Sequence, residues 1–171
     1  MIEHQAMPLK KTQKTRRNPQ KIGVISDTHG LLRPEALAAL RGVDLIIHAG
    51  DIGSREIIDR LNEVAPTLAI RGNNDREPWA KSIPETRLLE CGPSTIFVIH
   101  NLKELGFDPA GRRIGVVISG HSHKPSITER DGVLYVNPGS AGPRRFKLPI
   151  AIATLHIDSS KATAKILELT A

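Results

Sequence analysis

The sequence lacks the features of secreted, disulfide-bonded and membrane-spanning proteins. It has a single cysteine, Cys91, so no internal disulfide can form, and we expect this residue to be a small buried side chain rather than a nucleophile. No run approaches the roughly 18 apolar residues of a membrane span, and the N-terminal segment has no apolar stretch typical of a secretory signal. These absences predict a soluble, cytoplasmic protein that makes no contact with membranes.

Aromatic residues are also scarce, at 3% of the chain, which leaves little surface for stacking on nucleobases. The formal net charge of +6 would suggest nucleic-acid binding, but +5 of it falls within residues 1–21. We therefore expect residues 1–20 to be a basic, disordered tail and residues 21–171 to form one domain. The tail leaves nucleic acid open as a partner. The basic residues of the first 21 positions are Lys10, Lys11, Lys14, Arg16, Arg17 and Lys21.

Apolar runs alternate with helical patterns in the first half of the chain, which is typical of parallel strands joined by helices. Pro34 suits the first turn of a helix in which Leu37, Ala38 and Leu40 face inward, and Ser54 can cap a second helix. The predicted strands of this half are residues 22–26, 43–48 and 67–70.

Beyond residue 85 the pattern changes to strands separated by turns. So many strands suit two sheets packed face to face, and the helices of the first half need a sheet to cover. We therefore predict an α/β fold, a layered sandwich of two mixed β-sheets flanked by helices. The predicted strands of this half are residues 86–91, 95–100, 114–119, 133–136, 150–157 and 162–169.

Five loops that follow apolar runs carry side chains of the metal-ligand type. Loops at the carboxyl ends of parallel strands gather along one edge of a sheet, so side chains far apart in sequence can converge there. Asp51 has two carboxylate oxygens and can bridge two cations, and Gly50 before it gives the backbone room. The candidate ligands, three oxygen donors and four imidazoles, are Asp27, His29, Asp51, Asn73, His100, His121 and His123.

This donor set is sufficient for two divalent cations that share one carboxylate, and it points to hydrolysis of a phosphate ester by a metal-bound hydroxide. Oxygen and imidazole ligands exclude a soft thiolate site. We expect the site to bind two divalent ions. Manganese is the leading candidate, and iron, zinc, nickel or cobalt also suit these ligands. Each motif alone is more often an ordinary turn or a buried histidine, so the prediction rests on their joint order.

These ordered motifs resemble the calcineurin-like metallophosphoesterase superfamily, in particular its small single-domain YfcE-type phosphodiesterases, over roughly residues 21–169. The chain matches D-x-H, GD, GN, a single His and GHxH in that order, and residues 137–140 resemble the NPGS turn of this branch. The resemblance implies one metal held by Asp27, His29, Asp51 and His123. It implies a second metal held by Asp51, Asn73, His100 and His121.

The chain departs from the superfamily at the GNHE motif, where it has Asn74 and Asp75. The histidine of that motif can protonate the leaving group, and a neutral amide cannot, which argues against a protein-phosphatase-like mechanism. Candidate transition-state contacts are Asn74, Asn137 and Arg144, the last because a guanidinium fork fits phosphate oxygens.

Three function classes follow. The first is a metal-dependent phosphodiesterase. The second is a protein-interaction scaffold, because the fold resembles that of the retromer subunit Vps29, which is regarded chiefly as a protein-interaction module. The third is a nuclease or nucleic-acid binder that uses the basic tail. The substrate of the first class would be a phosphate ester. The sequence leaves the oligomeric state open, with a homodimer as one outcome.

Overall fold

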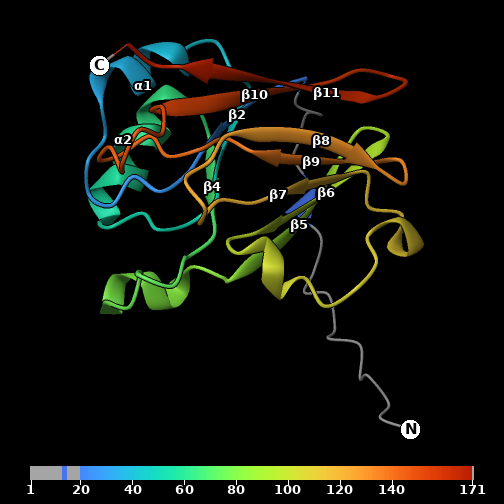
Figure 1. Ribbon diagram of the computed structural model, residues 1–171, viewed down its shortest axis with the longest axis horizontal. Helices are drawn as coiled ribbons and strands as arrows, with labels where there is room; N and C mark the ends of the chain where they lie inside the picture. Colours follow the sequence, from blue (N-terminus) through green and yellow to red (C-terminus); the bar gives the residue numbers. More distant parts are fainter. Residues whose placement is uncertain (1–12, 15–19, 171) are drawn as a thin grey trace, which may run out of the picture.

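The computed structural model describes residues 13–14 and 20–170, which form two mixed β-sheets (Figure 1). Figure 1 shows the sheets stacked, with the one that contains β10 and β11 above the one that contains β8 and β9. The predicted layered sandwich is therefore confirmed. Most of the predicted basic tail lies outside the described residues, and the boundary of the domain stays a prediction.

One sheet has five strands in the order β11-β10-β2-β3-β4. Strands β2, β3 and β4 are parallel, whereas β10 pairs antiparallel with both β2 and β11. The helices α1 (Pro34–Ala39) and α2 (Arg55–Val64) connect the parallel strands, as the alternating pattern predicts. The strand bounds are β2 (Lys21–Ile25), β3 (Leu45–His48), β4 (Thr67–Ala69), β10 (Ala151–Ile157) and β11 (Ala162–Glu168).

The other sheet has six strands in the order β1-β5-β6-β7-β9-β8, with β6, β7 and β9 parallel. The short 3-10 helix η1 (Pro78–Ser82) lies between β4 and β5, and η2 (Leu102–Glu104) and η3 (Ala110–Arg112) lie between β6 and β7. The strand bounds are β1 (Gln13–Lys14), β5 (Thr86–Cys91), β6 (Ser94–Ile99), β7 (Val116–Ile118), β8 (Ser126–Arg130) and β9 (Val133–Asn137).

Strands β2 and β3 are mostly apolar because both faces of the five-stranded sheet are covered there. Ile22 and Val24 on β2 pack between the two sheets, whereas Ile25 packs against the helices with Ala36 and Leu61. A strand covered on both sides reads as a continuous apolar run instead of an alternating one. The core therefore fixes the carboxyl ends of the parallel strands, where polar loops begin.

Three details differ from the sequence-based predictions. Strand β8 was not predicted, because its residues are mostly polar and its side chains are mostly exposed. Ala38 on α1 is exposed, and Ala36 is the buried residue of that helix, with Leu40 buried just beyond its end. Ser54 lies at the start of α2 but makes no side-chain capping hydrogen bond. Over the described residues, no helix combines the length and apolarity needed to cross a membrane.

Candidate metal centre

All seven predicted ligands lie at one edge of the molecule, on loops that follow parallel strands of both sheets. In the five-stranded sheet, Asp27 and His29 follow β2, Asp51 follows β3 and Asn73 follows β4. In the six-stranded sheet, His100 follows β6, and the loop with His121 and His123 follows β7. The convergence expected of carboxyl-terminal loops is therefore present, and it joins loops from both sheets.

The first group of donors consists of Asp27, His29 and His123, whose ligand atoms lie within 4.8 Å of one another. His123 Nε2 is 3.2 Å from Asp27 Oδ1 and 3.3 Å from His29 Nε2. Two ring nitrogens and a carboxylate oxygen at such distances surround a common point, as ligands of one cation do.

The second group consists of Asp51, His100 and His121, again within 4.8 Å. His100 Nε2 is 3.3 Å from Asp51 Oδ2, and Asn73 Oδ1 is 3.2 Å from His121 Nδ1. Asp51 Oδ2 is also 3.8 Å from His29 Nε2 of the first group. Asp51 thus lies between the two groups, at the position that a bridging carboxylate requires.

Several buried polar atoms of the site have no hydrogen-bond partner among the described residues: Asp27 Oδ1, His100 Nε2 and His123 Nδ1. His100 Nδ1 lies 2.7 Å from the Ala49 carbonyl oxygen. Because a carbonyl only accepts, Nδ1 carries the proton, and Nε2, 3.3 Å from Asp51 Oδ2, is the nitrogen available to a cation. Unpartnered buried polar atoms are costly, so these residues fit a cation that would satisfy them.

Both carboxylates are held in the ionised form that binds a metal. Burial raises the pKa of Asp27, but the nearby His123 imidazole and the hydrogen bond from the Ser26 hydroxyl outweigh it and keep the pKa below its usual value. Burial acts in the same way on Asp51, where His100 and the backbone N–H of Asn74 bring the pKa well below the usual range. The site therefore keeps two negative charges beside its imidazoles at neutral pH.

The ligand loops adopt backbone conformations that side chains other than glycine rarely take. Such positions cost about 1–3 kcal/mol each and cluster at functional sites, where the surrounding structure holds them. Five of the seven candidate ligands have positive φ, namely Asp27 (55°), His29 (45°), Asp51 (54°), His121 (67°) and His123 (59°). The fold thus holds these side chains in place at the expense of local backbone strain.

Asp75 holds two loops of the site in place. The sequence singles out this residue only because it differs from the GNHE motif. Its buried carboxylate accepts backbone N–H hydrogen bonds from Ile52 and Gly53 after β3 and from Gly72 after β4, at 2.9–3.0 Å. Asp75 therefore joins the loop that carries Asp51 to its own loop.

His48 and Thr28 form a second supporting contact. Thr28 Oγ1 donates to the Ile52 carbonyl, so His48 Nε2, 2.9 Å away, donates to Thr28 Oγ1. His48 Nδ1 accepts from the Gly50 N–H, and complete burial lowers the pKa of His48 to about 4. His48 is a neutral residue that holds the loops of Asp27 and Asp51 together.

Asn137 has a role other than the predicted substrate contact. Its Nδ2 donates to the Gly120 carbonyl at 2.8 Å and lies 3.0 Å from Ser122 Oγ, while its Oδ1 accepts from the Gly139 N–H. The amide is buried and its hydrogen-bonding capacity is used within the protein. Asn137 therefore positions the loop of His121, and we no longer propose that it contacts the transition state.

The other two residues predicted to contact the transition state, Asn74 and Arg144, are exposed. The backbone N–H of Asn74 donates to Asp51 Oδ1, and its Nδ2 donates to Asp51 Oδ2, both at 2.9 Å. One Nδ2 hydrogen remains for a substrate. Arg144 lies on an exposed loop four residues after Ser140, whose hydroxyl donates to the Asp27 carbonyl.

A family model described as the calcineurin-like phosphoesterase superfamily domain matches residues 21–160. The chain belongs to the calcineurin-like phosphoesterase superfamily. The predicted family is confirmed, and with it the prediction of a metal-dependent phosphoesterase whose substrates are phosphate esters.

Curated members of the superfamily are similar over most of the chain. A "Probable metallophosphoesterase" of Methanothermobacter thermautotrophicus is 37% identical over 161 residues, which cover 85% of this chain and 91% of the relative. Phosphodiesterase YfcE of Escherichia coli strain K12 is 30% identical over 168 residues, which cover 81% and 88%.

Solved structures of the superfamily share the fold. One described as a novel archaeal phosphodiesterase superposes with a TM-score of 0.71 at 28% identity, covering 86% of this chain and 99% of that chain. Vps29 of Chaetomium thermophilum superposes with a TM-score of 0.72, covering 88% and 98%, but it is only 17% identical and shows the fold alone.

Proposed function

We propose that this protein hydrolyses phosphodiesters with two divalent metal ions, and we expect manganese as the metal. The seven residues of the candidate metal centre would carry this activity. The position of Asp51 carries this proposal, because its Oδ2 is 3.8 Å from His29 Nε2 and 3.3 Å from His100 Nε2, one histidine from each donor group. Bound ions of this kind supply a hydroxide nucleophile at neutral pH and offset charge on the phosphate oxygens. The proposed ligand sets are Asp27, His29, Asp51 and His123 for one ion, and Asp51, Asn73, His100 and His121 for the other.

The other residues of the site orient the substrate. The free Nδ2 hydrogen of Asn74 and the guanidinium of Arg144 are placed to donate to phosphate oxygens. Asn74 stands where GNHE has the histidine that can protonate a leaving group, and its neutral amide cannot do so. The neighbouring Asp75 carboxylate accepts three backbone N–H groups and is not free to act in its place. We therefore expect faster hydrolysis of esters whose leaving groups depart without protonation.

The experiment that tests this proposal compares bis-p-nitrophenyl phosphate with p-nitrophenyl phosphate, using protein stripped of metal and reloaded with Mn²⁺, Fe²⁺, Zn²⁺, Ni²⁺ or Co²⁺. We expect Mn²⁺ to restore cleavage of the diester. Asp51→Ala should lower kcat by more than about 100-fold, because it removes the ligand shared by both ions. Asp59→Ala is the matched control, since Asp59 is an exposed residue of α2 that lies beside Arg55 and is not a candidate ligand.

The outcomes separate the alternatives. Preference for the monoester would change the proposal to a phosphatase. A folded protein that turns over neither ester with any of the five metals would favour a protein-interaction scaffold. Equal activity of Asp51→Ala and Asp59→Ala would refute the proposed role of the metal centre.

A further inference from the structure

Phe146 differs from every other aromatic residue of the chain. The sequence has five aromatic residues, and the other four have partners. Phe97 packs edge-on against Phe107, Arg130 lies over the Tyr135 ring, and the Trp79 indole donates to Glu77. The Phe146 ring is 92% exposed. An aromatic ring turned fully to solvent is unusual, because its apolar faces gain nothing from water.

The backbone holds this ring outward. Leu148 N donates to the Arg145 carbonyl at 3.2 Å, which closes a four-residue turn with Phe146 at its second position. Phe146 has φ of 54°, in the left-handed region that bulky side chains avoid. Strained residues of this kind cluster at active sites and ligand-binding segments, where the surrounding structure holds them.

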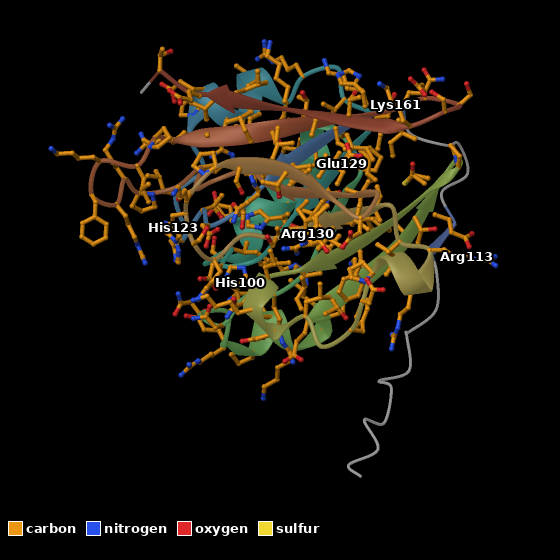
Figure 2. All side chains as sticks on the ribbon, turned by 45° about the vertical axis from the view of Figure 1, so that its right-hand side comes forward. His100, Arg113, His123, Glu129, Arg130 and Lys161 are labelled. Carbon is orange, nitrogen blue, oxygen red and sulfur yellow. The ribbon has the colours of Figure 1, made fainter. Side chains whose placement is uncertain are left out.

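The turn is attached to the candidate metal centre. Ser140 Oγ donates to the Asp27 carbonyl at 3.0 Å, and Arg33 Nε donates to the Gly142 carbonyl at 3.1 Å. Figure 2 shows the connection between β9 and β10 projecting from the body of the molecule on the side where His123 lies.

The residues beside Phe146 carry positive charge and no compensating acid. Arg144, Arg145 and Lys147 are exposed, and within the described part of the chain none forms an ion pair with a carboxylate. The other exposed large apolar residues, Leu31 and Leu102, follow His29 and His100 by two positions. Residues 144–147 thus combine an exposed ring with cations that have no carboxylate partner among the described residues.

We propose that residues 144–147 bind the nucleoside part of the substrate, with the base stacked on Phe146, so that the protein acts on nucleotide phosphodiesters. This inference rests on the proposed phosphodiesterase function and names its substrate class. A nucleobase has the flat π-face that matches an exposed ring, and stacking of this kind is sequence-tolerant. Arg145 and Lys147 would contact additional phosphate oxygens of the same nucleotide.

The observations favour a nucleobase over an alkyl chain. An alkyl chain needs continuous apolar surface, whereas Phe146 is flanked in sequence by Arg145 and Lys147, both exposed. Cations beside a stacked base are also favourable, because an arginine can lie over or beside a π-system. The scarcity of aromatic residues is no objection, since one exposed ring suffices for one base.

The test uses two diesters with the same leaving group, thymidine 5′-(p-nitrophenyl phosphate) and methyl p-nitrophenyl phosphate, with the full-length protein loaded with Mn²⁺. In each reaction water adds to phosphorus and the bond to p-nitrophenolate breaks, giving thymidine 5′-monophosphate or methyl phosphate. Phe146→Ala should raise KM for the thymidine ester about fivefold or more and leave KM for the methyl ester unchanged. Phe146→Trp should retain the wild-type KM for the thymidine ester, because it keeps a stacking ring.

Each result has one meaning for this inference. If the wild type hydrolyses neither ester, the proposed phosphodiesterase function fails. If it hydrolyses both and Phe146→Ala alters both KM values equally or neither, the phosphodiesterase function survives and the nucleotide inference is wrong. The inference is also wrong if dodecyl p-nitrophenyl phosphate is preferred to the thymidine ester and Phe146→Ala removes that preference, because the ring then serves an alkyl chain.

Discussion

Asp75 shows how much a candidate metal centre depends on residues that bind no metal. We expect Asp75→Asn to weaken Mn²⁺ binding by about 10–100-fold, as loss of a group that orients ligands commonly does. The substituted amide would direct N–H groups at the backbone N–H of Ile52 or Gly72, which lowers the free energy of unfolding by about 3 kcal/mol. Isothermal titration with Mn²⁺ and urea unfolding measure the two effects.

Asp59→Asn is the control for this substitution, because it makes the same chemical change on the exposed face of α2. Both variants should remain folded at 25 °C by circular dichroism. Unchanged Mn²⁺ affinity in folded Asp75→Asn protein would show that the two loops keep their positions without this carboxylate.

The sequence was informative about the donors and much less so about their supports. Asp27, Asp51 and His100 each end an apolar run, so their positions relative to the sheet edge could be predicted. Asp75 and Asn137 act through hydrogen bonds to backbone groups, and a backbone N–H leaves no trace in the amino-acid sequence. Their roles became visible only when residues distant in the chain were placed side by side.

At the level of elements, the loops after β3 and β4 approach so closely that only glycine fits between them. A Cβ on Gly72 would lie 2.1 Å from Asp51 Oδ1 and 2.4 Å from the Asp51 backbone nitrogen. Gly72→Ala should therefore displace Asp51, weaken Mn²⁺ binding at least about tenfold and lower the free energy of unfolding by about 1–3 kcal/mol. Titration with Mn²⁺ and thermal unfolding check this expectation.

Gly106→Ala is a suitable comparison for the Gly72 variant, because a Cβ on Gly106 would meet nothing within 4 Å. It should bind Mn²⁺ as the wild type does. If both alanine variants bind equally well, the loop after β4 yields without moving Asp51, and the contact has no functional importance.

Elements buried on both sides were the easiest to predict. Strands β2, β3 and β10 consist mostly of buried apolar residues, and their predicted bounds agree with the structure to within about two residues. Strand β8 was missed because it lies at the edge of its sheet, with exposed polar side chains that give no apolar signal. Its existence follows from its antiparallel pairing with β9, a contact that a local pattern does not encode.

On the scale of the whole molecule, each donor group takes side chains from both sheets. Asp27 and His29 meet His123, and Asp51 meets His100 and His121. Ions bound there would link the two sheets, in a chain whose single cysteine cannot provide a covalent link. At a metal concentration of 100 times the dissociation constant, one site adds about 2.7 kcal/mol to the free energy of unfolding.

We therefore expect Mn²⁺ to raise the midpoint of thermal unfolding by about 5–10 °C relative to protein treated with EDTA. Differential scanning calorimetry with both samples at the same pH measures the shift. Asp51→Ala should show a much smaller shift, because it removes the ligand between the two groups. A Mn²⁺-independent midpoint in the wild type would mean that the ions do not join the sheets.

The division of the donors between the sheets also has a consequence during synthesis. Asp27, His29, Asp51 and Asn73 emerge from the ribosome first, yet neither three-residue group is complete until His121 and His123 have been added. A nascent or truncated chain that ends before these histidines has acidic side chains but no finished coordination site. A complete site can therefore bind metal only after more than two-thirds of the chain has been translated. A metal-loaded centre shows that both halves of the chain have been synthesised and have packed together.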